Sequence, residues 1–271
     1  MAGGGAADRL RDDRPGHAAA GGALRRPGEP MKRSVREVAN DKLGAVEELV
    51  TRAGVTTCTI VDVLDGLGVV NAVLPSALRR LSGGGAMAFG TAYTVSWAPV
   101  RKGPQIKAAS PSTWEQVRDF LVPEVSDGTG RIYVAGAGAL LTEAALAGGM
   151  SVTYLLRQLG FNGVVLGGAV RDLAVIESMP LPVVAANVVP TDTQGAYRVH
   201  ETGAECLIGE VRVRTGDWVF SDGNGVVVVP DDLVLDVLKL SAEIEATEQE
   251  ILRRLGAGER LPGLIDALGR I

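Results

Sequence analysis

The stretch Gly163–Asp172 reads GVVLGGAVRD and carries the clearest pattern in the chain. Its first four residues form a short apolar run, which predicts a buried strand. Two glycines, at 167 and 168, interrupt the run, and glycine allows backbone conformations and close ligand approach that side chains prevent. Arg171 and Asp172 follow. Arginine suits a carboxylate or phosphate and aspartate suits Mg²⁺, so these residues indicate a site. A surface ion pair after a tight turn explains the same residues, and composition alone does not choose.

The composition predicts one sizeable domain of the α/β class. The 271 residues are 46% hydrophobic, with 36 glycines and only 4% aromatics, which favours a Val, Leu, Ile and Ala core with many tight turns. A net charge of −5 argues against nucleic-acid binding. No apolar run reaches the ~18 residues of a membrane span. Cys58 and Cys206 match no metal or disulfide pattern and predict reduced thiols, so we expect a soluble, cytoplasmic protein.

The chain divides into three predicted regions. Residues 1–30 are rich in Gly, Ala and Arg without apolar periodicity, so we expect a disordered tail, and Met31 is a candidate start of the folded protein. Residues 31–230 carry the strand and helix patterns. Within them, residues 98–128 are polar and predict an inserted loop. Residues 231–271 predict a C-terminal helical extension, because apolar residues recur there at helical spacing.

Periodicity and capping residues place the elements. Thr56 and the three residues after it offer caps for the helix that begins at Ile60, and Asp222 is interpreted as an architectural turn residue. Helices are predicted over residues 32–53, 60–68, 114–121, 140–146, 148–159, 172–179 and 230–255. Strands are predicted over residues 87–95, 131–136, 163–166, 182–186, 211–214, 219–220 and 226–229. Gly136 and Gly138 begin a dinucleotide-binding pattern, but its third glycine position is Leu141, so we exclude that site.

Several polar residues are candidates for a site near the central motif. Small residues open the helix at 148–151, where free backbone N–H groups and the helix dipole favour a bound anion. The segment 190–195 is polar and turn-forming, and is suited to lie over a pocket mouth. A histidine can act as a general base, but no residue near His200 in the sequence is spaced as a catalytic partner, and we interpret His200 as structural. The inserted loop contributes either to an anion pocket or to a solvated surface through its basic residues, Arg101, Lys102 and Lys107.

The segment GVVLGGAVRD resembles the signature of the family that contains 4-hydroxy-4-methyl-2-oxoglutarate aldolase and the regulator of ribonuclease E activity A. The likeness extends roughly from Thr56 to Pro230. It implies a layered α/β/β sandwich with mixed sheets, of the swivelling-domain type. It also implies a homo-oligomer, either a trimer or a dimer of trimers.

The resemblance assigns roles to particular residues. It implies that Asp172 binds Mg²⁺ or Mn²⁺ and that Arg171 holds the substrate. The backbone amides that would seat the substrate carboxylate belong to Gly148, Gly149, Met150 and Ser151. Two positions depart from the family. Gly149 stands where the aldolases have an acid that organises the water shell of the metal, and Gly167 stands where many members have aspartate. Asp172 is retained, whereas the ribonuclease regulators tend to lose it.

These residues predict a divalent-metal-dependent carbon–carbon lyase that acts on a small 2-oxo acid. The reaction would be retro-aldol cleavage or oxaloacetate-type decarboxylation, both of which leave a pyruvate enolate. The missing acid at Gly149 favours decarboxylation slightly, because decarboxylation needs no base at that position. The alternative is a non-catalytic binding or regulatory protein that acts through an oligomer surface. Retention of Asp172 favours the enzyme, and loss of the flanking acids favours the binding protein.

Overall fold

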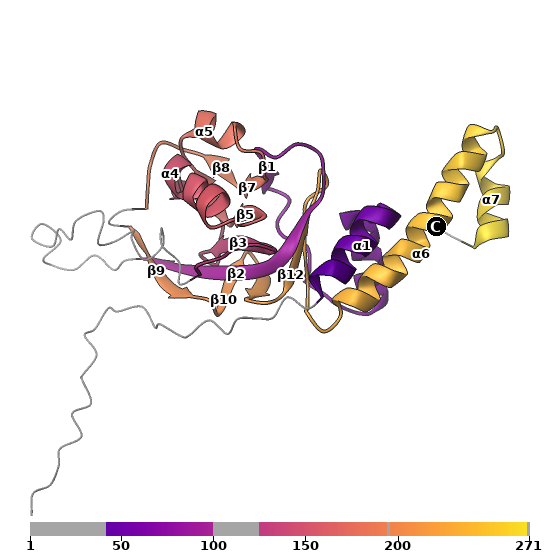
Figure 1. Cartoon of the computed structure of the whole chain (residues 1–271), viewed down its shortest axis with the longest axis horizontal. Coiled ribbons are helices and arrows are strands. Elements are labelled where there is room, and N and C mark those ends of the chain that lie inside the picture. The colour runs from indigo at the N-terminus through magenta and orange to yellow at the C-terminus, as the bar shows by residue number, and fades with distance from the viewer. Residues whose placement is uncertain (1–41, 100–124, 194–195, 270–271) are drawn as a thin grey trace, which may run out of the picture.

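The computed structural model describes residues 42–99, 125–193 and 196–269 (Figure 1). An α/β body contains the sheets, and a helical arm projects from one end of it (Figure 1). The predicted tail over residues 1–30, the helix over 114–121 and the three basic residues of the inserted loop lie outside the described residues. Among the helices described, none combines the length and the apolar character needed to span a membrane.

The central sheet of the body has eight strands. Their order is β1 (Arg79–Arg80), β7 (Val183–Ala185), β5 (Gly163–Leu166), β3 (Arg131–Gly136), β2 (Ala88–Pro99), β12 (Trp218–Ser221) and β13 (Val226–Val229), with β9 (Tyr197–Thr202) also paired to β2. Strands β2, β3, β5 and β7 are parallel, and the other pairings are antiparallel. The strands predicted at these places are confirmed. Strand β2 continues to Pro99, so residues 98 and 99 belong to a strand and not to a loop.

Successive side chains along each strand point to opposite sides of the central sheet. Both sides are buried, because a layer of other elements covers each of them. Tyr93 and Tyr133 face one side, where they pack with Phe161 beneath the short helices and a second sheet. Ile132 and Val134 face the other side, where the hairpin of β10 (Glu205–Ile208) and β11 (Val211–Arg214) covers them. This layered arrangement of mixed sheets and helices confirms the predicted fold class.

A smaller sheet of three parallel strands carries the central sequence motif. Its strands are β4 (Leu141–Ala147), β6 (Gly168–Val170) and β8 (Asn187–Val188). The helix predicted over residues 140–146 is therefore wrong. The Leu, Glu and Ala residues of this segment favour a helix in isolation. Pairing with β6 and burial of Ala144 and Leu146 in the core override that preference and make the segment a strand.

Gly167 joins the two sheets, a role that the sequence did not predict. Its N–H donates to the carbonyl oxygen of Ala135 in β3 at 2.7 Å, and its carbonyl accepts from the N–H of Leu141 in β4 at 3.0 Å. A Cβ at this position would lie 2.9 Å from Ile208 Cγ1. The chain thus passes from β5 to β6 through a position with no room for a side chain.

Two short helical segments lie beside the small sheet. The first is α4 (Gly149–Thr153), which continues as a π-helical turn over Tyr154–Gln158, and the second is α5 (Leu173–Glu177). Both confirm the predicted helices at these places. Val152 and Leu155 on the first, and Ile176 on the second, are buried in the core under the small sheet. The positions where these helices begin are therefore fixed by packing.

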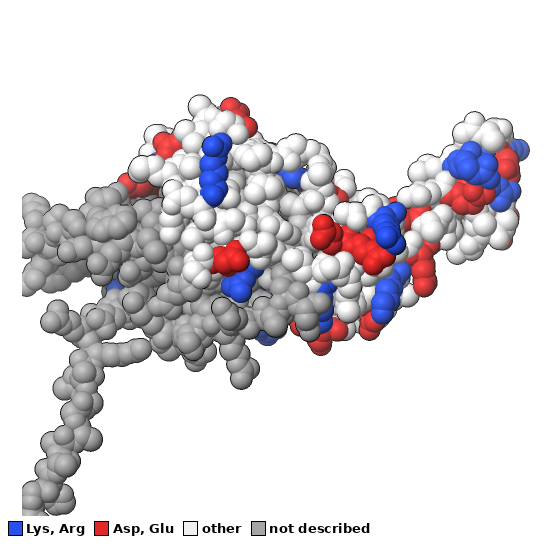
Figure 2. All heavy atoms as spheres, in the orientation of Figure 1, with Lys and Arg blue, Asp and Glu red and all other residues white. Residues whose placement is uncertain are grey.

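The helical arm consists of α6 (Val234–Gly256) and α7 (Leu261–Leu268), with α1 (Leu43–Ala53) and α2 (Thr57–Gly66) against the first part of α6. Helices α1, α2 and α6 bury a cluster against β12 and β13 that includes Val46, Ile60, Trp218, Phe220 and Val237. Helix α7 lies within the predicted C-terminal helical extension, where the sequence analysis placed no separate helix, and folds back along the far end of α6 (Figure 1). On the face drawn in Figure 2, charged side chains gather over the arm, and the body is mostly uncharged.

The amino end of α2 is enclosed by side chains from two other elements. Glu245 of α6 accepts from the Thr59 hydroxyl at 2.8 Å and from the Thr56 backbone N–H at 3.2 Å. Asp222, in the turn between β12 and β13, accepts from the backbone N–H and the hydroxyl of Thr57 at 2.9 and 2.7 Å. The predicted cap at Thr56 and the architectural interpretation of Asp222 are confirmed.

Candidate functional site

The candidate site lies where the three parallel strands of the small sheet end. Gly148 follows β4, Arg171 follows β6, and the segment to Asp192 follows β8. The N–H of Arg171 donates to the Ala147 carbonyl at 3.1 Å, so the strand ends stay in register beyond the strands themselves. Parallel strands present their carboxyl ends at one edge of a sheet, which is where α/β proteins commonly bind ligands. The topology therefore gathers three separate segments at one edge.

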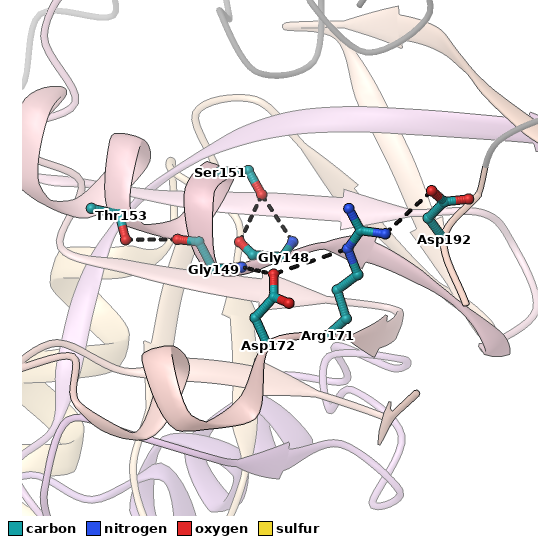
Figure 3. Close-up of polar contacts among 7 residues, drawn as sticks. All are labelled: Gly148, Gly149, Ser151, Thr153, Arg171, Asp172 and Asp192. Carbon is teal, nitrogen blue, oxygen red and sulfur yellow. Dashed lines mark hydrogen bonds and ion pairs between the residues drawn. The ribbon is translucent and has the colours of Figure 1, made fainter. Parts of the chain in front are cut away.

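Arg171 lies between two carboxylates (Figure 3). Its Nη1 donates to Asp192 Oδ2 at 3.2 Å, and its Nε lies 4.0 Å from Asp172 Oδ2. The exposed fractions of the three side chains are 36% for Arg171, 47% for Asp172 and 32% for Asp192. All three are therefore half-buried and remain accessible to a small ligand.

Asp172 is held in an unusual backbone conformation. Its φ of 65° and ψ of 48° lie in the left-handed region, which few residues other than glycine adopt, although aspartate and asparagine tolerate it. This conformation directs the carboxylate to the start of α4, where Oδ2 accepts from the Gly149 N–H at 2.9 Å (Figure 3). Among the described residues, Oδ1 has no hydrogen-bond partner and remains available to a cation or water.

The turn at residues 148–151 offers fewer amides than the sequence analysis assumed. The Gly149 N–H binds Asp172, and the Gly148 N–H donates to the Ser151 hydroxyl at 3.0 Å. That hydroxyl also donates to the Gly148 carbonyl at 2.9 Å, and Ser151 is buried. The N–H groups of Met150 and Ser151 have no partner among the described residues, as expected in the first turn of a helix. Two of the four amides thus remain for a substrate carboxylate.

The glycines of this turn leave no room for side chains. A Cβ at Gly148 would lie 2.8 Å from Asp172 Oδ2, and a Cβ at Gly149 would lie 3.0 Å from Val175 Cβ and 3.1 Å from Asp172 Cβ. The acid that the resemblance leads one to expect at Gly149 is absent, and a side chain there would press on Val175 and Asp172.

The oxygen donors at this edge suit a loosely held Mg²⁺ or Mn²⁺. Among the described residues, no three His, Cys, Asp or Glu side chains come together as a metal cage. Mg²⁺ is commonly bound by one or two carboxylates, while water and substrate complete its coordination. Asp172, with one oxygen uncommitted, fits that pattern. Asp192 supplies a second carboxylate on the other side of Arg171.

Other reactive side chains are poor candidates for chemistry. His200 is exposed on β9, away from the candidate site residues in the chain, and nothing in its position gives it a chemical role. Cys206 is buried, and burial raises the pKa of its thiol to about 12. Cys58 is exposed, but partial burial and then the nearby carboxylates of Asp222 and Asp62 raise its pKa too. Neither thiol carries the low pKa of a reactive cysteine.

Asp192 is the site residue that the sequence analysis missed. The segment 190–195 was expected at a pocket mouth, but no role was given to its aspartate. Arg171 directly follows β6, whereas Asp192 lies four residues after the end of β8, so the sequence offered only a weak signal for it. Because β8 is only two residues long, pairing with β6 is visible only in the fold.

Comparisons with known sequences agree with this geometry. Residues 57–228 match the family described as RraA-like: Aldolase/RraA. Protein DlpA of Legionella pneumophila is 30% identical over 205 residues, which cover 74% of this chain and 30% of DlpA. A Stutzerimonas stutzeri protein named "Putative 4-hydroxy-4-methyl-2-oxoglutarate aldolase" is 33% identical over 109 residues, which cover 40% of this chain and 64% of that protein. The chain thus spans less than two thirds of the length of either relative.

Solved structures show the same fold at low sequence identity. An uncharacterized protein from Pseudomonas syringae has a TM-score of 0.65 at 22% identity, with 82% of this chain and 96% of that chain covered. Streptomyces coelicolor RraAS2 has a TM-score of 0.62 at 23% identity, with 78% and 98% covered. The family match extends over more than half of the sequence and includes the small sheet with its Arg171–Asp172 pair. The chain therefore belongs to the RraA-like family, Aldolase/RraA.

Proposed function

We propose that the protein is a metal-dependent carbon–carbon lyase that cleaves a small 2-oxo acid to give pyruvate. The observation that carries the proposal is Arg171 set between two carboxylates at the end of a parallel sheet, with an uncommitted oxygen on Asp172. The names of relatives as aldolases support the same class of reaction. A divalent cation held by Asp172 would supply Lewis-acid stabilisation of negative charge on the 2-oxo oxygen.

The residues of the chain would bind and orient the substrate. Arg171 would donate a charge-assisted hydrogen bond from Nη2, the nitrogen that neither carboxylate contacts, to an oxygen of the 2-oxo acid. The backbone N–H groups of Met150 and Ser151 would donate hydrogen bonds to one oxygen of the substrate carboxylate. Met150 is exposed beside this turn and offers an apolar surface to the rest of the substrate.

The packing around the glycines favours decarboxylation over retro-aldol cleavage. In cleavage of a 4-hydroxy-2-oxo acid, the hydroxyl loses its proton as the C3–C4 bond breaks, so a base must accept that proton. In decarboxylation of oxaloacetate the C3–C4 bond breaks with loss of CO₂, and its electron pair forms the pyruvate enolate, which then takes up a proton at C3. Gly149 and Gly167 supply no side chain that would serve as the base, and a Cβ would lie 3.0 Å from Val175 at the first and 2.9 Å from Ile208 at the second.

A second candidate function is a non-catalytic binding protein that acts through the surface of an oligomer. The observation that favours it is the lack of a three-residue metal cage among the described residues. We propose a homo-oligomer, a trimer or a dimer of trimers, under either function. Sedimentation equilibrium on the purified chain tests that assembly, and a monomer would exclude it.

Pyruvate release tests the lyase. Purified protein is assayed with oxaloacetate and with 4-hydroxy-4-methyl-2-oxoglutarate, each with Mg²⁺, with Mn²⁺ and with chelator. We expect metal-dependent release that disappears in Arg171→Ala and persists in Arg212→Ala, which removes an arginine paired with Glu205 on the β10–β11 hairpin. Release that survives in Arg171→Ala would reject the proposed site. A folded protein that neither releases pyruvate nor binds Mg²⁺ or Mn²⁺ would leave the binding protein.

A further inference from the structure

Asp192 contacts the substrate-binding arginine but was assigned no role by the motif. Its Oδ2 accepts from Arg171 Nη1 at 3.2 Å, on the side of the guanidinium away from Asp172 (Figure 3). The two residues come from different strand ends, after β6 and after β8. An ion pair between exposed side chains contributes little, so the placement of Asp192 decides whether this contact has a role.

The backbone fixes Asp192 on both sides. The N–H of Ala145 in β4 donates to the Thr191 carbonyl at 2.8 Å, and Asp192 forms a parallel bridge with Ala145. On the other side, Thr193 is buried, and its carbonyl accepts from the N–H of Tyr197 at 2.9 Å. The aspartate therefore lies on a segment anchored to the small sheet, and its carboxylate is held in place beside Arg171.

Two anchored carboxylates restrict the guanidinium. An arginine side chain has several rotatable bonds and loses much conformational freedom when it is ordered. Here Nη1 is bound by Asp192 and Nε lies near Asp172, while Nη2 has no partner among the described residues. The arginine is therefore oriented before a ligand arrives, and a preoriented group binds and stabilises charge better than a mobile one.

The same contact lowers the positive charge that a ligand meets. Arg171 contributes one positive charge, and its two neighbours Asp172 and Asp192 contribute two negative charges at neutral pH. Without a cation these three side chains carry a net charge of −1, which opposes an anionic ligand. Replacing Asp192 by a neutral residue of the same shape would bring that net charge to zero without removing the hydrogen bond.

We propose that Asp192 is a positioning residue for Arg171, which it orients toward the substrate while weakening its attraction for anions. This role rests on the proposed lyase function, in which Arg171 holds the 2-oxo acid. It makes two separable predictions, one on the mobility of the arginine and one on the kinetics.

The first test measures Arg171 itself and needs no substrate. The Nε–H signal of Arg171 is recorded by NMR on protein labelled with ¹⁵N-arginine and is assigned by its loss in Arg171→Lys. In Asp192→Ala we expect the signal to shift and its exchange with water to accelerate. In Asp192→Asn, whose amide oxygen still accepts a hydrogen bond, we expect a smaller change. Glu250→Gln, which removes a carboxylate paired with Arg253 on the arm, is the control and should shift the Arg253 signal while leaving the Arg171 signal unchanged.

The second test separates kcat from KM in pyruvate release from oxaloacetate. Because the guanidinium loses its orientation, we expect Asp192→Ala to lower kcat about 10-fold or more. Because charge opposition falls while orientation is kept, we expect Asp192→Asn to lower KM, and added salt to reduce that difference, since salt screens exposed charges. A purely structural role would instead change kcat in parallel with the unfolding temperature, and would not depend on salt.

The outcomes are distinguishable. An unchanged Arg171 signal in Asp192→Ala overturns the positioning role, whatever the activity. A changed signal in a protein that releases no pyruvate supports the positioning role and rejects the lyase. A changed signal with wild-type kcat and KM in an active enzyme overturns the claim that Asp192 serves catalysis.

Discussion

Carboxylates meet the start of a helix in two regions of this molecule, and the two regions differ in what remains unsatisfied. At α2, Asp222 and Glu245 accept from Thr56, Thr57 and Thr59, and Glu245 is buried. At α4, Asp172 accepts from Gly149 alone and is half-exposed.

The difference shows which feature marks a candidate site. A carboxylate at a helix start is stabilised by the free N–H groups and the helix dipole wherever it occurs, so the contact itself carries no functional information. At α2 both oxygens of Asp222 accept hydrogen bonds, and Glu245 accepts two through Oε1 in a buried place that no ligand reaches. At α4 one oxygen of Asp172 and one nitrogen of Arg171 have no partner among the described residues. Unused bonding capacity at an accessible place is the feature that separates the candidate site from the structural cap.

The largest expected effect is on Asp172. Asp172→Asn keeps a residue that tolerates the left-handed conformation and an oxygen that accepts from Gly149, so we expect the unfolding temperature to change little. It removes the negative charge, so we expect pyruvate release to fall by about 100-fold to 1000-fold, the scale of losing one preorganised electrostatic contact. Steady-state assays with Mg²⁺ and thermal unfolding measure the two effects. Full activity would show that the two carboxylate clusters do not differ in function.

The opposite result is expected at α2. Glu245→Ala removes a buried acceptor shared by the Thr59 hydroxyl and the Thr56 N–H, which keep only their bonds to each other's residue, so we expect the free energy of unfolding to fall by about 1 kcal/mol. Urea unfolding measures this loss. Glu243→Ala, at an exposed position of the same helix, is the matched control and should change stability little. Loss of kcat by Glu245→Ala at a temperature where the protein remains folded would contradict the comparison.

A similar effect on stability is expected from filling the turn before α4. Gly149→Ala places a Cβ 3.0 Å from Val175 and 3.1 Å from Asp172 Cβ. We expect the free energy of unfolding to fall by about 1 kcal/mol, at the low end of the range for overpacking, because Val175 is partly exposed and can shift. Displacement of Asp172 should also lower pyruvate release. Adding Val175→Ala removes the contact with Val175 Cγ1, also at 3.0 Å, and keeps the one with Cβ, so we expect the double variant to recover part of the stability. Losses that simply add in the double variant would refute this packing explanation.

The smallest effect concerns pH and the α2 cap. Burial acts to raise the pKa of Asp222, but hydrogen bonds from Thr57 and Asn224 outweigh burial and lower it. A carboxyl group whose pKa is lower in the folded state stabilises the protein above its unfolded pKa, about 3.9, and loses that contribution as pH falls through the folded pKa. We therefore expect unfolding free energy to decline below about pH 4 and the decline to be shallower in Asp222→Asn. The free energy of unfolding is measured by urea titration of both proteins at a series of pH values. An equal dependence of that free energy on pH in the two proteins would exclude Asp222 as a cause of the decline.

Local sequence pattern was sufficient where the structure of a segment depends on residues within or next to that segment. The apolar runs at 131–136 and 163–166 are strands because they lie in the middle of a parallel sheet, buried on both faces. The cap at Thr56 was visible because a capping residue acts on its own helix. The pair Arg171–Asp172 was visible because both residues follow one strand directly.

Local pattern failed where a distant segment determines the structure. Residues 141–147 contain good helix formers, and only pairing with β6 makes them a strand. The helical extension over residues 231–271 was predicted, but its division into α6 and α7 was not, because α7 packs on α6 only after the chain reverses.

The sequence by itself determined the fold class, the capped helix and the neighbouring arginine and aspartate, because each depends on residues close together in the chain. Only the tertiary structure decided the composition of the site. It brought Asp192 to Arg171 across 21 residues, turned Asp172 onto the start of α4, and left Gly149 and Gly167 without room for a side chain. The physical reason is that register between parallel strands and packing between sheets are properties of segments far apart in sequence, and no local pattern encodes which strand ends will meet.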